Sequence, residues 1–183
     1  MIMTTYCDYC NSHPEDTFNK DYHDTQYGFP LQDNHLLFER FILEINQAGL
    51  SWITILKKAN NFRFAYSDFD IDAVASFSET DRIRLLNDPG IIRNRLKVNA
   101  AIENAQRIQN LRKDYGSFKG WLDSHHPQSL ESWTKLFKRT FTFTGGEIVK
   151  EFLMSTGYLA GAHTSDCPIY EVVAAKRPPW ILR

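Results

Sequence analysis

The sequence predicts an all-α protein, and two observations support this class. Apolar residues recur every three or four positions over residues 33–157, which is the spacing that gives a helix one buried face. Residues that cap helices stand between these stretches. Only residues 140–144 alternate in the manner of a β-strand. We therefore expect one domain over residues 1–183, with terminal segments 1–30 and 158–183 flanking the helical body.

The expected helices follow one another from residue 33 onward. Asp33 or Asn34 can cap the first helix, and Gly49 ends it. Ser51 can cap a second helix that runs to about Tyr66. Later helices are expected after Asp70, Ser78, Pro89, Ser117 and Gly145.

Composition excludes several classes of protein. Hydrophobic residues make up 43% of the chain, which is typical of a globular protein and not of a disordered one. The formal net charge is −1, so this is not a globally basic nucleic-acid binder, although a local basic surface remains possible. The 3 cysteines are too few and odd in number for a disulfide framework. No long apolar run or leader is present, so we expect a cytoplasmic monomer with no membrane partner.

Residues 44–58 form the stretch around which the chain is organised. One face of the preceding helix is apolar at Leu37, Phe41, Ile45 and Ala48. Glu44 falls on that same face, and Trp52 opens the apolar face of the next helix after a short turn. A carboxylate in apolar surroundings is costly unless it is paired, and such groups gather at functional sites. The alternative is that Glu44 tilts to the edge of the face and pairs with a surface Lys or Arg.

Cysteine and histidine residues near both ends of the chain suggest a metal site. The opening segment has a C-x-x-C pair, and the closing segment has an H-x-x-x-C pair. Thiolates and imidazoles suit Zn²⁺, which takes four of them in a closed structural site. One ion would join two segments that the sequence predicts to be irregular. The alternative is free buried thiols and surface histidines. Five candidates compete for four places: Cys7, Cys10, His23, His163 and Cys167.

A Pro89-Gly90 turn between two predicted helices suggests a contact with nucleic acid. Arg93, Arg95 and Lys97 follow it closely, and a turn that leads into a helix start offers N–H groups to a phosphate. This pattern is typical of a helix-hairpin-helix element, which holds a DNA backbone without reading its sequence. The alternative is an ordinary turn followed by a solvated basic face.

Aromatic residues are expected around Glu44. Tyr9, Tyr22, Tyr27 and Trp52 can sandwich a planar ligand, while a carboxylate accepts hydrogen bonds from an exocyclic amine. The alternative is that each is an ordinary core aromatic, which is the interpretation we give to Trp121 and Trp133.

These residues lie in motifs that resemble the DNA-3-methyladenine glycosylase I family. The motifs span nearly the whole chain in order: Tyr22-His23-Asp24-x-x-Tyr27-Gly28-x-Pro30, Leu43-Glu44-x-x-Gln47-Ala48-Gly49-Leu50-Ser51-Trp52, Gly90-Ile91-Ile92-Arg93-x-Arg95 and His163-x-x-x-Cys167. The resemblance implies a helix-hairpin-helix DNA glycosylase fold with a zinc clip that joins the termini. It also implies base-excision repair, in which 3-methyladenine is hydrolysed from alkylated double-stranded DNA and released as the product.

The resemblance also implies one structural Zn²⁺ ion. By position its ligands are Cys7, His23, His163 and Cys167. Cys7 is preferred to Cys10 because Cys7-x-Tyr9 resembles the family's Cys-x-Trp opening. Four protein ligands leave no open position for a reactive water.

Roles at the base and the duplex are carried over in the same way. Glu44 matches the acid that hydrogen-bonds the excised base, and Trp52 matches the ring that stacks on it. Tyr22 matches the tyrosine of the pocket, with Tyr9 and Tyr27 at its edge. The contacts with the duplex fall on the Gly49-Leu50 turn, which enters the gap, and on the hairpin residues Gly90, Ile91, Arg93 and Arg95.

The chain departs from the family pattern at two places. Tyr9 and Tyr27 stand where tryptophans are usual, and residues 147–151 bring Glu147 and Glu151 near the expected pocket. Both departures concern base preference more than the class of reaction. Two alternatives follow: a catalytically inactive helix-hairpin-helix zinc protein that binds damaged DNA, and a hydrolase in which the zinc is catalytic.

Overall fold

The protein is helical throughout the part of the chain that the structure describes, residues 5–182 of a computed structural model. This confirms the all-α class. The α-helices are α1 Tyr6–Ser12, α2 Thr17–Thr25, α3 Asn34–Gln47, α4 Trp52–Leu56, α5 Ala59–Ala65, α6 Ile71–Ala75, α7 Glu79–Asn87, α8 Arg95–Tyr115, α9 Phe118–His125, α10 Leu130–Thr140, α11 Gly146–Ser155 and α12 Pro168–Ala175. Two 3₁₀ turns, Ser67–Phe69 and Pro179–Ile181, complete the set.

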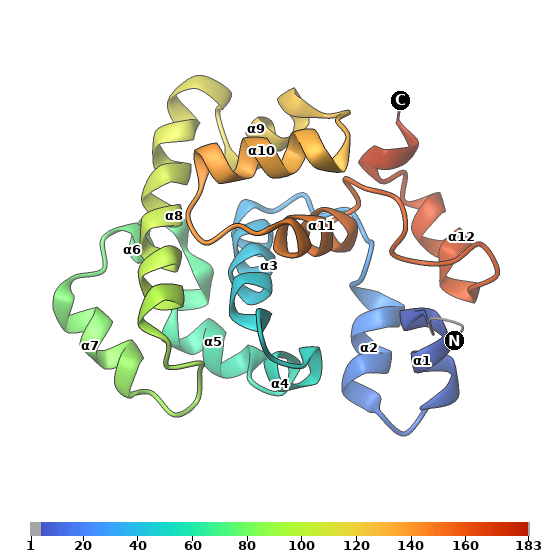
Figure 1. Cartoon of the computed structure of the whole chain (residues 1–183), viewed down its shortest axis with the longest axis horizontal. Helices are drawn as coiled ribbons and strands as arrows, with labels where there is room; N and C mark the ends of the chain where they lie inside the picture. The colour runs from blue at the N-terminus through green and yellow to red at the C-terminus, as the bar shows by residue number, and fades with distance from the viewer. Residues whose placement is uncertain (1–4, 183) are drawn as a thin grey trace.

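Helix α3 crosses the centre of the molecule and is covered on several sides (Figure 1). It contacts α4, α8, α9 and α11, and every side chain from Leu37 to Asn46 is buried. Its Phe41 ring lies among aromatic rings of three other segments: Phe118, Phe137, Phe141 and Phe152. The helix that carries Glu44 is therefore the core element of the fold.

Both ends of α3 are held by specific groups. Asp33 is the N-cap, as predicted, and its carboxylate accepts from the N–H groups of His35 and Leu36. At the other end Lys97 Nζ donates to the carbonyls of Asn46, at 2.8 Å, and Ala48, at 2.7 Å. The Lys97 side chain therefore stabilises the fold, which corrects both the expectation that it offers its charge to a phosphate and the alternative of a solvated basic face.

The second predicted helix is interrupted. Ser51 stands at its N-cap, but α4 ends at Leu56 and α5 begins at Ala59. At the break Lys58 Nζ donates to the carbonyls of Pro89, at 2.9 Å, and Gly90, at 3.4 Å. Lys58 therefore links the break between α4 and α5 to the connection between α7 and α8.

The expected strand over residues 140–144 is wrong. Within residues 5–182 no strand is present to pair with it. Instead Thr142 N–H and its carbonyl bond to the Asn104 side chain on α8, at 2.9 and 3.1 Å. The alternating pattern reflects an extended loop that buries Phe141 while an asparagine satisfies its backbone.

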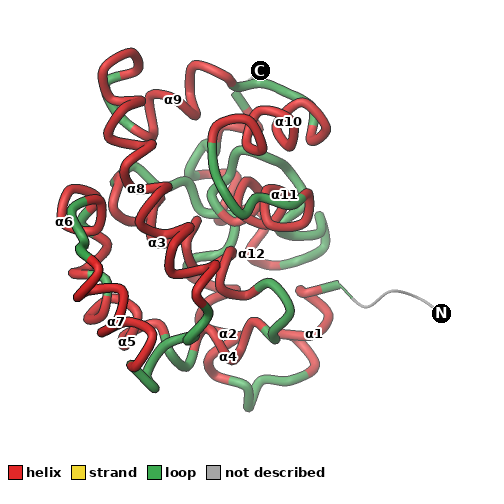
Figure 2. Tube along the Cα trace, turned by 60° about the vertical axis from the view of Figure 1, so that its left-hand side comes forward, coloured by secondary structure: helices red, strands yellow, loops and turns green. Residues whose placement is uncertain are grey.

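The terminal segments are also more regular than predicted. Capping by Thr5 and Asp16 starts α1 and α2, which contact each other, and α2 also contacts α4. Figures 1 and 2 show α12 on the same side of the molecule as α1 and α2. Residues 1–4 and 183 of the expected terminal segments lie outside the described residues. Among the helices of residues 5–182, none has the length and apolarity needed to cross a membrane.

Replacing Lys97 by methionine tests how far the C-terminus of α3 depends on this side chain. Lys97→Met keeps the aliphatic stem and removes the donor, so we expect a loss of about 2 kcal/mol in the free energy of unfolding, the typical value of hydrogen bonds to a charged group. Urea denaturation measures it. Lys113→Met, at an exposed position near the end of α8, removes the same charge and serves as control. Equal midpoints for the two variants would contradict this role.

Candidate active site and metal centre

A cavity of about 640 Å³ opens beside the C-terminal half of α3. Helices α1 to α4 and α11 contribute to its walls, together with the loop around Gly161. Its principal side chains are Tyr6, Tyr22, Tyr27, Glu44, Trp52 and Glu151. Four of these, Tyr22, Tyr27, Glu44 and Trp52, are residues that the sequence predicts to surround one ligand.

Glu44 supplies the carboxylate of this cavity. Its side chain is only 4% exposed, and among the ion pairs of residues 5–182 none includes it. The predicted alternative, pairing with a surface cation, is therefore not what the structure shows. Burial raises the pKa of Glu44 to about 8, with a further rise from Glu151, while Arg40 opposes the shift.

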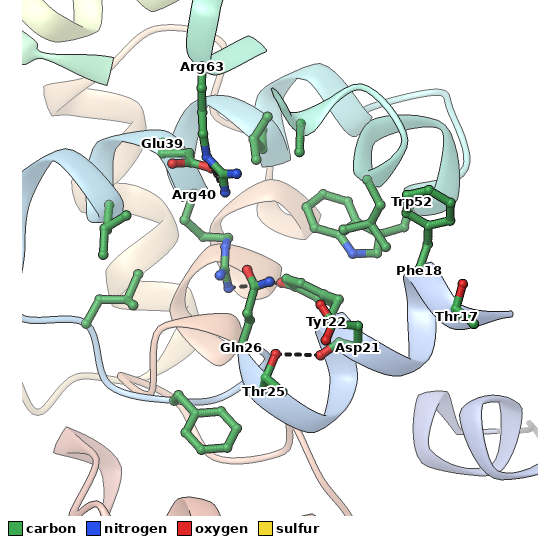
Figure 3. Close-up of a pocket in the computed structure, with 16 residues that line it drawn as sticks. Thr17, Phe18, Asp21, Tyr22, Thr25, Gln26, Glu39, Arg40, Trp52 and Arg63 are labelled. Atoms are coloured by element: carbon green, nitrogen blue, oxygen red, sulfur yellow. Dashed lines mark hydrogen bonds and ion pairs between the residues drawn. The ribbon is translucent and has the colours of Figure 1, made fainter. Parts of the chain in front are cut away.

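Arg40 lies one turn before Glu44 and holds Tyr22 in place (Figure 3). Its Nη1 donates to the Tyr22 hydroxyl at 3.0 Å and to the Ser155 carbonyl at 3.2 Å. The guanidinium carbon is 4.9 Å from the centre of the Tyr22 ring. Burial raises the pKa of Tyr22 far above its usual value, so this hydroxyl stays neutral. Arg40 is thus occupied by Tyr22 and the backbone and does not form an ion pair with Glu44.

Trp52 is the first residue of α4 and lies against Tyr22, with ring centres 5.0 Å apart. The two rings separate the Glu44 cavity from a second hollow of about 690 Å³, which Figure 3 shows. That hollow is lined by α2, α3, α4 and α5, and its walls do not include Glu44. The aromatic pair therefore has one side turned toward the carboxylate.

Tyr9 does not line the cavity, although the sequence places it at the edge of the pocket. Its ring stacks on His13 at 4.4 Å, and its hydroxyl donates to Asp16 at 2.8 Å. Tyr6 lines the cavity instead, with its ring 5.3 Å from that of Tyr27. Because this segment is helical, a residue two positions after Cys7 lies on the opposite face. The capping box formed by Thr5 and Asp8 is the local signal that this segment is a short helix, in which Tyr6 directly precedes Cys7.

The turn over Gly49 and Leu50 projects beside the cavity mouth. Gly49 has a φ of +80°, and a Cβ there would meet no atom within 4 Å. Leu50 is 38% exposed. Gln47, which also lines the cavity, accepts from Leu50 N–H through its carbonyl and donates to the Leu50 carbonyl through its side chain. The turn is exposed to solvent, and its two hydrogen bonds with Gln47 hold its conformation.

Helices α7 and α8 contact each other and are joined by the short connection that contains Gly90. A Cβ at Gly90 would lie 2.9 Å from Asp88 Oδ1, which accepts from Gly90 N–H at 2.7 Å, so a larger residue would displace the Asp88 side chain from this hydrogen bond. Ile91 is buried and anchors the turn. Arg93 and Arg95 are exposed.

Four ligand-type side chains converge where the terminal segments meet. The group consists of Cys7, His23, His163 and Cys167, all buried, with one ligand atom of each within 4.8 Å of the others. Separations between sulfur and nitrogen are 3.4 Å for Cys7 and His23 and 3.7 Å for the three other pairs measured. Ligands of a tetrahedral metal ion with bonds of about 2.0–2.3 Å lie about 3.3–3.8 Å apart. The group can therefore hold a metal ion.

The outer nitrogens of both histidines are also engaged. His23 Nδ1 lies 2.7 Å from Asp24 Oδ1, and His163 Nε2 lies 2.7 Å from the Tyr27 carbonyl. Because a carbonyl only accepts, His163 Nε2 carries the proton and Nδ1 is free to face the group. Such outer partners are typical of metal-binding histidines. Cys10 is buried outside the group and donates to the Asn19 carbonyl.

Comparison with known proteins gives a consistent family. The family model described as methyladenine glycosylase matches residues 11–135, more than half of the chain. The DNA-3-methyladenine glycosylase 1 of Escherichia coli K12 is 37% identical, covering 81% of this chain and 89% of its own. The DNA-3-methyladenine glycosylase of Haemophilus influenzae is 34% identical, covering 91% and 98%. The solved 3-methyladenine DNA glycosylase I of Staphylococcus aureus is similar with a TM-score of 0.80, at 32% identity, covering 90% and 97%.

The two neighbouring cysteines give a direct test of the metal group. Cys7→Ser removes one of the four converging ligands, so we expect purified protein to lose its bound metal. Cys10→Ser leaves the group intact, so we expect both this variant and the parent to retain one ion per chain. Metal content by plasma mass spectrometry measures both. Retention by Cys7→Ser with loss by Cys10→Ser would contradict the assignment.

Proposed function

The chain belongs to the methyladenine glycosylase family, and from this premise we propose how it releases 3-methyladenine from alkylated double-stranded DNA. It is a DNA-repair glycosylase, which hydrolyses the bond between the base and deoxyribose. The observation that supports the residue roles most strongly is the Glu44 carboxylate, buried without an ion-pair partner in a cavity walled by aromatic rings.

A cationic base suits this carboxylate. Methylation at N3 of adenine in DNA gives the base a positive charge, so the base itself can be the counter-ion that Glu44 lacks. When the bond from C1′ to N9 breaks, its electron pair stays on the base, which leaves as neutral 3-methyladenine. Water forms the new bond to C1′ and gives up a proton. Because the leaving group is already activated, Glu44 needs only to recognise the cation and its exocyclic amine.

The aromatic walls suit a base taken out of the stack. A glycosylase must extrude its target nucleotide, at a cost of a few kcal/mol that is lower for a damaged base. We propose that the extruded base stacks on Trp52, with Tyr22, Tyr27 and Tyr6 around its edges. The relative from Staphylococcus aureus is described as recognising 3-methyladenine, which agrees with a planar purine as occupant.

The exposed turns suit the duplex. We propose that Leu50 fills the space the nucleotide vacates while the hairpin with Gly90, Ile91, Arg93 and Arg95 holds the backbone. Lys97 ties the start of α8 to the carbonyls just before Gly49. This link fixes Leu50 relative to the turn that contains Gly90. Binding of that turn to the DNA backbone would therefore also position Leu50 in the duplex.

The ion in the Cys7, His23, His163 and Cys167 group is proposed to be Zn²⁺. Two thiolates and two imidazoles at tetrahedral separations are its typical structural set. Bound there, the ion supplies no reactive water and stabilises the fold by crosslinking α1 and α2 to the segment before α12. In this proposal residues 1–30, 33–157 and 158–183 act as one unit. The bond from His163 to the Tyr27 carbonyl connects that crosslink to the wall of the base cavity.

Release of free base tests the function together with the role of Glu44. Methylated duplex DNA is incubated with the parent, Glu44→Gln and Glu103→Gln, and released bases are separated by chromatography. We expect the parent to release 3-methyladenine without cutting the strand. Glu44→Gln should lose about 100-fold in kcat/KM, about 2.7 kcal/mol, because the amide cannot neutralise the cation.

Glu103→Gln is the matched control for this test. Glu103 is the first acid on α8 after the Gly90 turn, it is exposed, and it is not among the residues that line the Glu44 cavity. We expect its excision rate to match the parent. A parent that is folded and metal-loaded yet releases no base would instead support a protein that only binds damaged DNA. Unchanged excision by Glu44→Gln would remove Glu44 from the mechanism.

A further inference from the structure

A second carboxylate lies in the same cavity as Glu44. Glu151 comes from α11 and Glu44 from α3, two helices in contact, and both side chains line the cavity. Tyr27, another lining residue, donates its hydroxyl to Glu151 Oε2 at 3.1 Å. This hydrogen bond fixes the Glu151 carboxylate at the cavity wall and leaves its second oxygen free of that contact.

The neighbouring cations are engaged elsewhere. Arg40 donates to Tyr22 and to the Ser155 carbonyl. Lys150 lines the cavity, but its ammonium pairs with Glu147 at 3.6 Å on the partly exposed side of α11. Both carboxylates line one cavity, and among the ion pairs of residues 5–182 neither of them has a partner. Two like charges in such a site are costly unless one takes a proton or a positive ligand enters.

We propose that Glu151 is a second base-contacting carboxylate, which makes this pocket select purines that carry a positive charge. The proposal rests on the proposed function and adds to it a residue that sets substrate preference. With Glu44 and Glu151 on different helices, a cationic purine on Trp52 meets negative charge on two edges. A neutral purine of the same shape gains nothing from the second charge and leaves the repulsion in place.

The expected effect is on binding and not on bond breaking. In the transition state positive charge leaves the base and appears on the sugar. A carboxylate that pairs with the base therefore stabilises the bound substrate at least as much as the transition state, and such an interaction lowers KM without raising kcat. Burial also raises the pKa of Glu151 above its usual value, which agrees with a group that gains from an incoming cation.

The experiment compares Glu151→Gln with Glu147→Gln. Both remove one negative charge from α11, but Glu147 is 86% exposed and does not line the cavity. The amide is isosteric and can still accept the Tyr27 hydroxyl, so the fold should persist, as circular dichroism will check. The ligands are 3,9-dimethyladeninium, whose charge is permanent, and neutral 9-methyladenine, with binding followed by tryptophan fluorescence.

For Glu151→Gln we expect affinity for 3,9-dimethyladeninium to fall about tenfold, the factor that about 1.4 kcal/mol represents. Affinity for 9-methyladenine should stay within about twofold of the parent, and so should kcat on methylated duplex, while KM rises about tenfold. Glu147→Gln should match the parent in all four measurements.

The proposal is overturned by unchanged affinity of Glu151→Gln for the cation, or by an equal loss of affinity for the cation and the neutral purine. The same loss in Glu147→Gln would also overturn it, because the effect would then be one of general charge. Failure of the underlying function would look different, since the parent itself would release no base from methylated DNA.

Discussion

Burial of the Glu44 carboxylate is the constraint on which the site depends. The most central helix of the fold carries this acid into a cavity where no other side chain forms an ion pair with it among residues 5–182. The nearest arginine, Arg40, is turned to Tyr22 and the backbone. Keeping a carboxylate in this state costs stability, and in the mechanism we propose a cationic base offsets this cost when it enters. In that mechanism the acid is preorganised for a charge that arrives only with the substrate.

The rest of the molecule keeps that cavity in shape. Lys97 holds the end of α3 and with it the exposed Gly49–Leu50 turn. On the opposite side, His163 bonds to the carbonyl of Tyr27, so the metal group reaches the cavity wall through one hydrogen bond. The group of Cys7, His23, His163 and Cys167 and the exposed Gly49–Leu50 turn are therefore parts of one support for the pocket.

Much of this could be predicted from residue spacing because it follows from helical periodicity. The buried face of α3, the position of Glu44 on it and the caps at Asp33 and Ser51 are local properties of the sequence. The prediction that Lys97 offers its charge to a phosphate is wrong, because a lysine close to two arginines is typical of a basic surface. Its carbonyl partners are apparent only once α8 is packed against α3. The predicted place of Tyr9 at the edge of the pocket differs from the structure because its segment lacks a long periodic pattern that would predict a helix. Capping by Thr5 nevertheless makes this segment a short helix.

The carboxyl carbon of Glu44, followed by NMR as pH is changed, tests the central claim most directly. In the free protein we expect a pKa of about 8 for Glu44, because burial without an ion-pair partner disfavours its charged form. Saturation with 3,9-dimethyladeninium should bring that pKa down, since the cation stabilises the carboxylate. A pKa near the ordinary value of about 4.5 in the free protein, unmoved by the cation, would contradict the account.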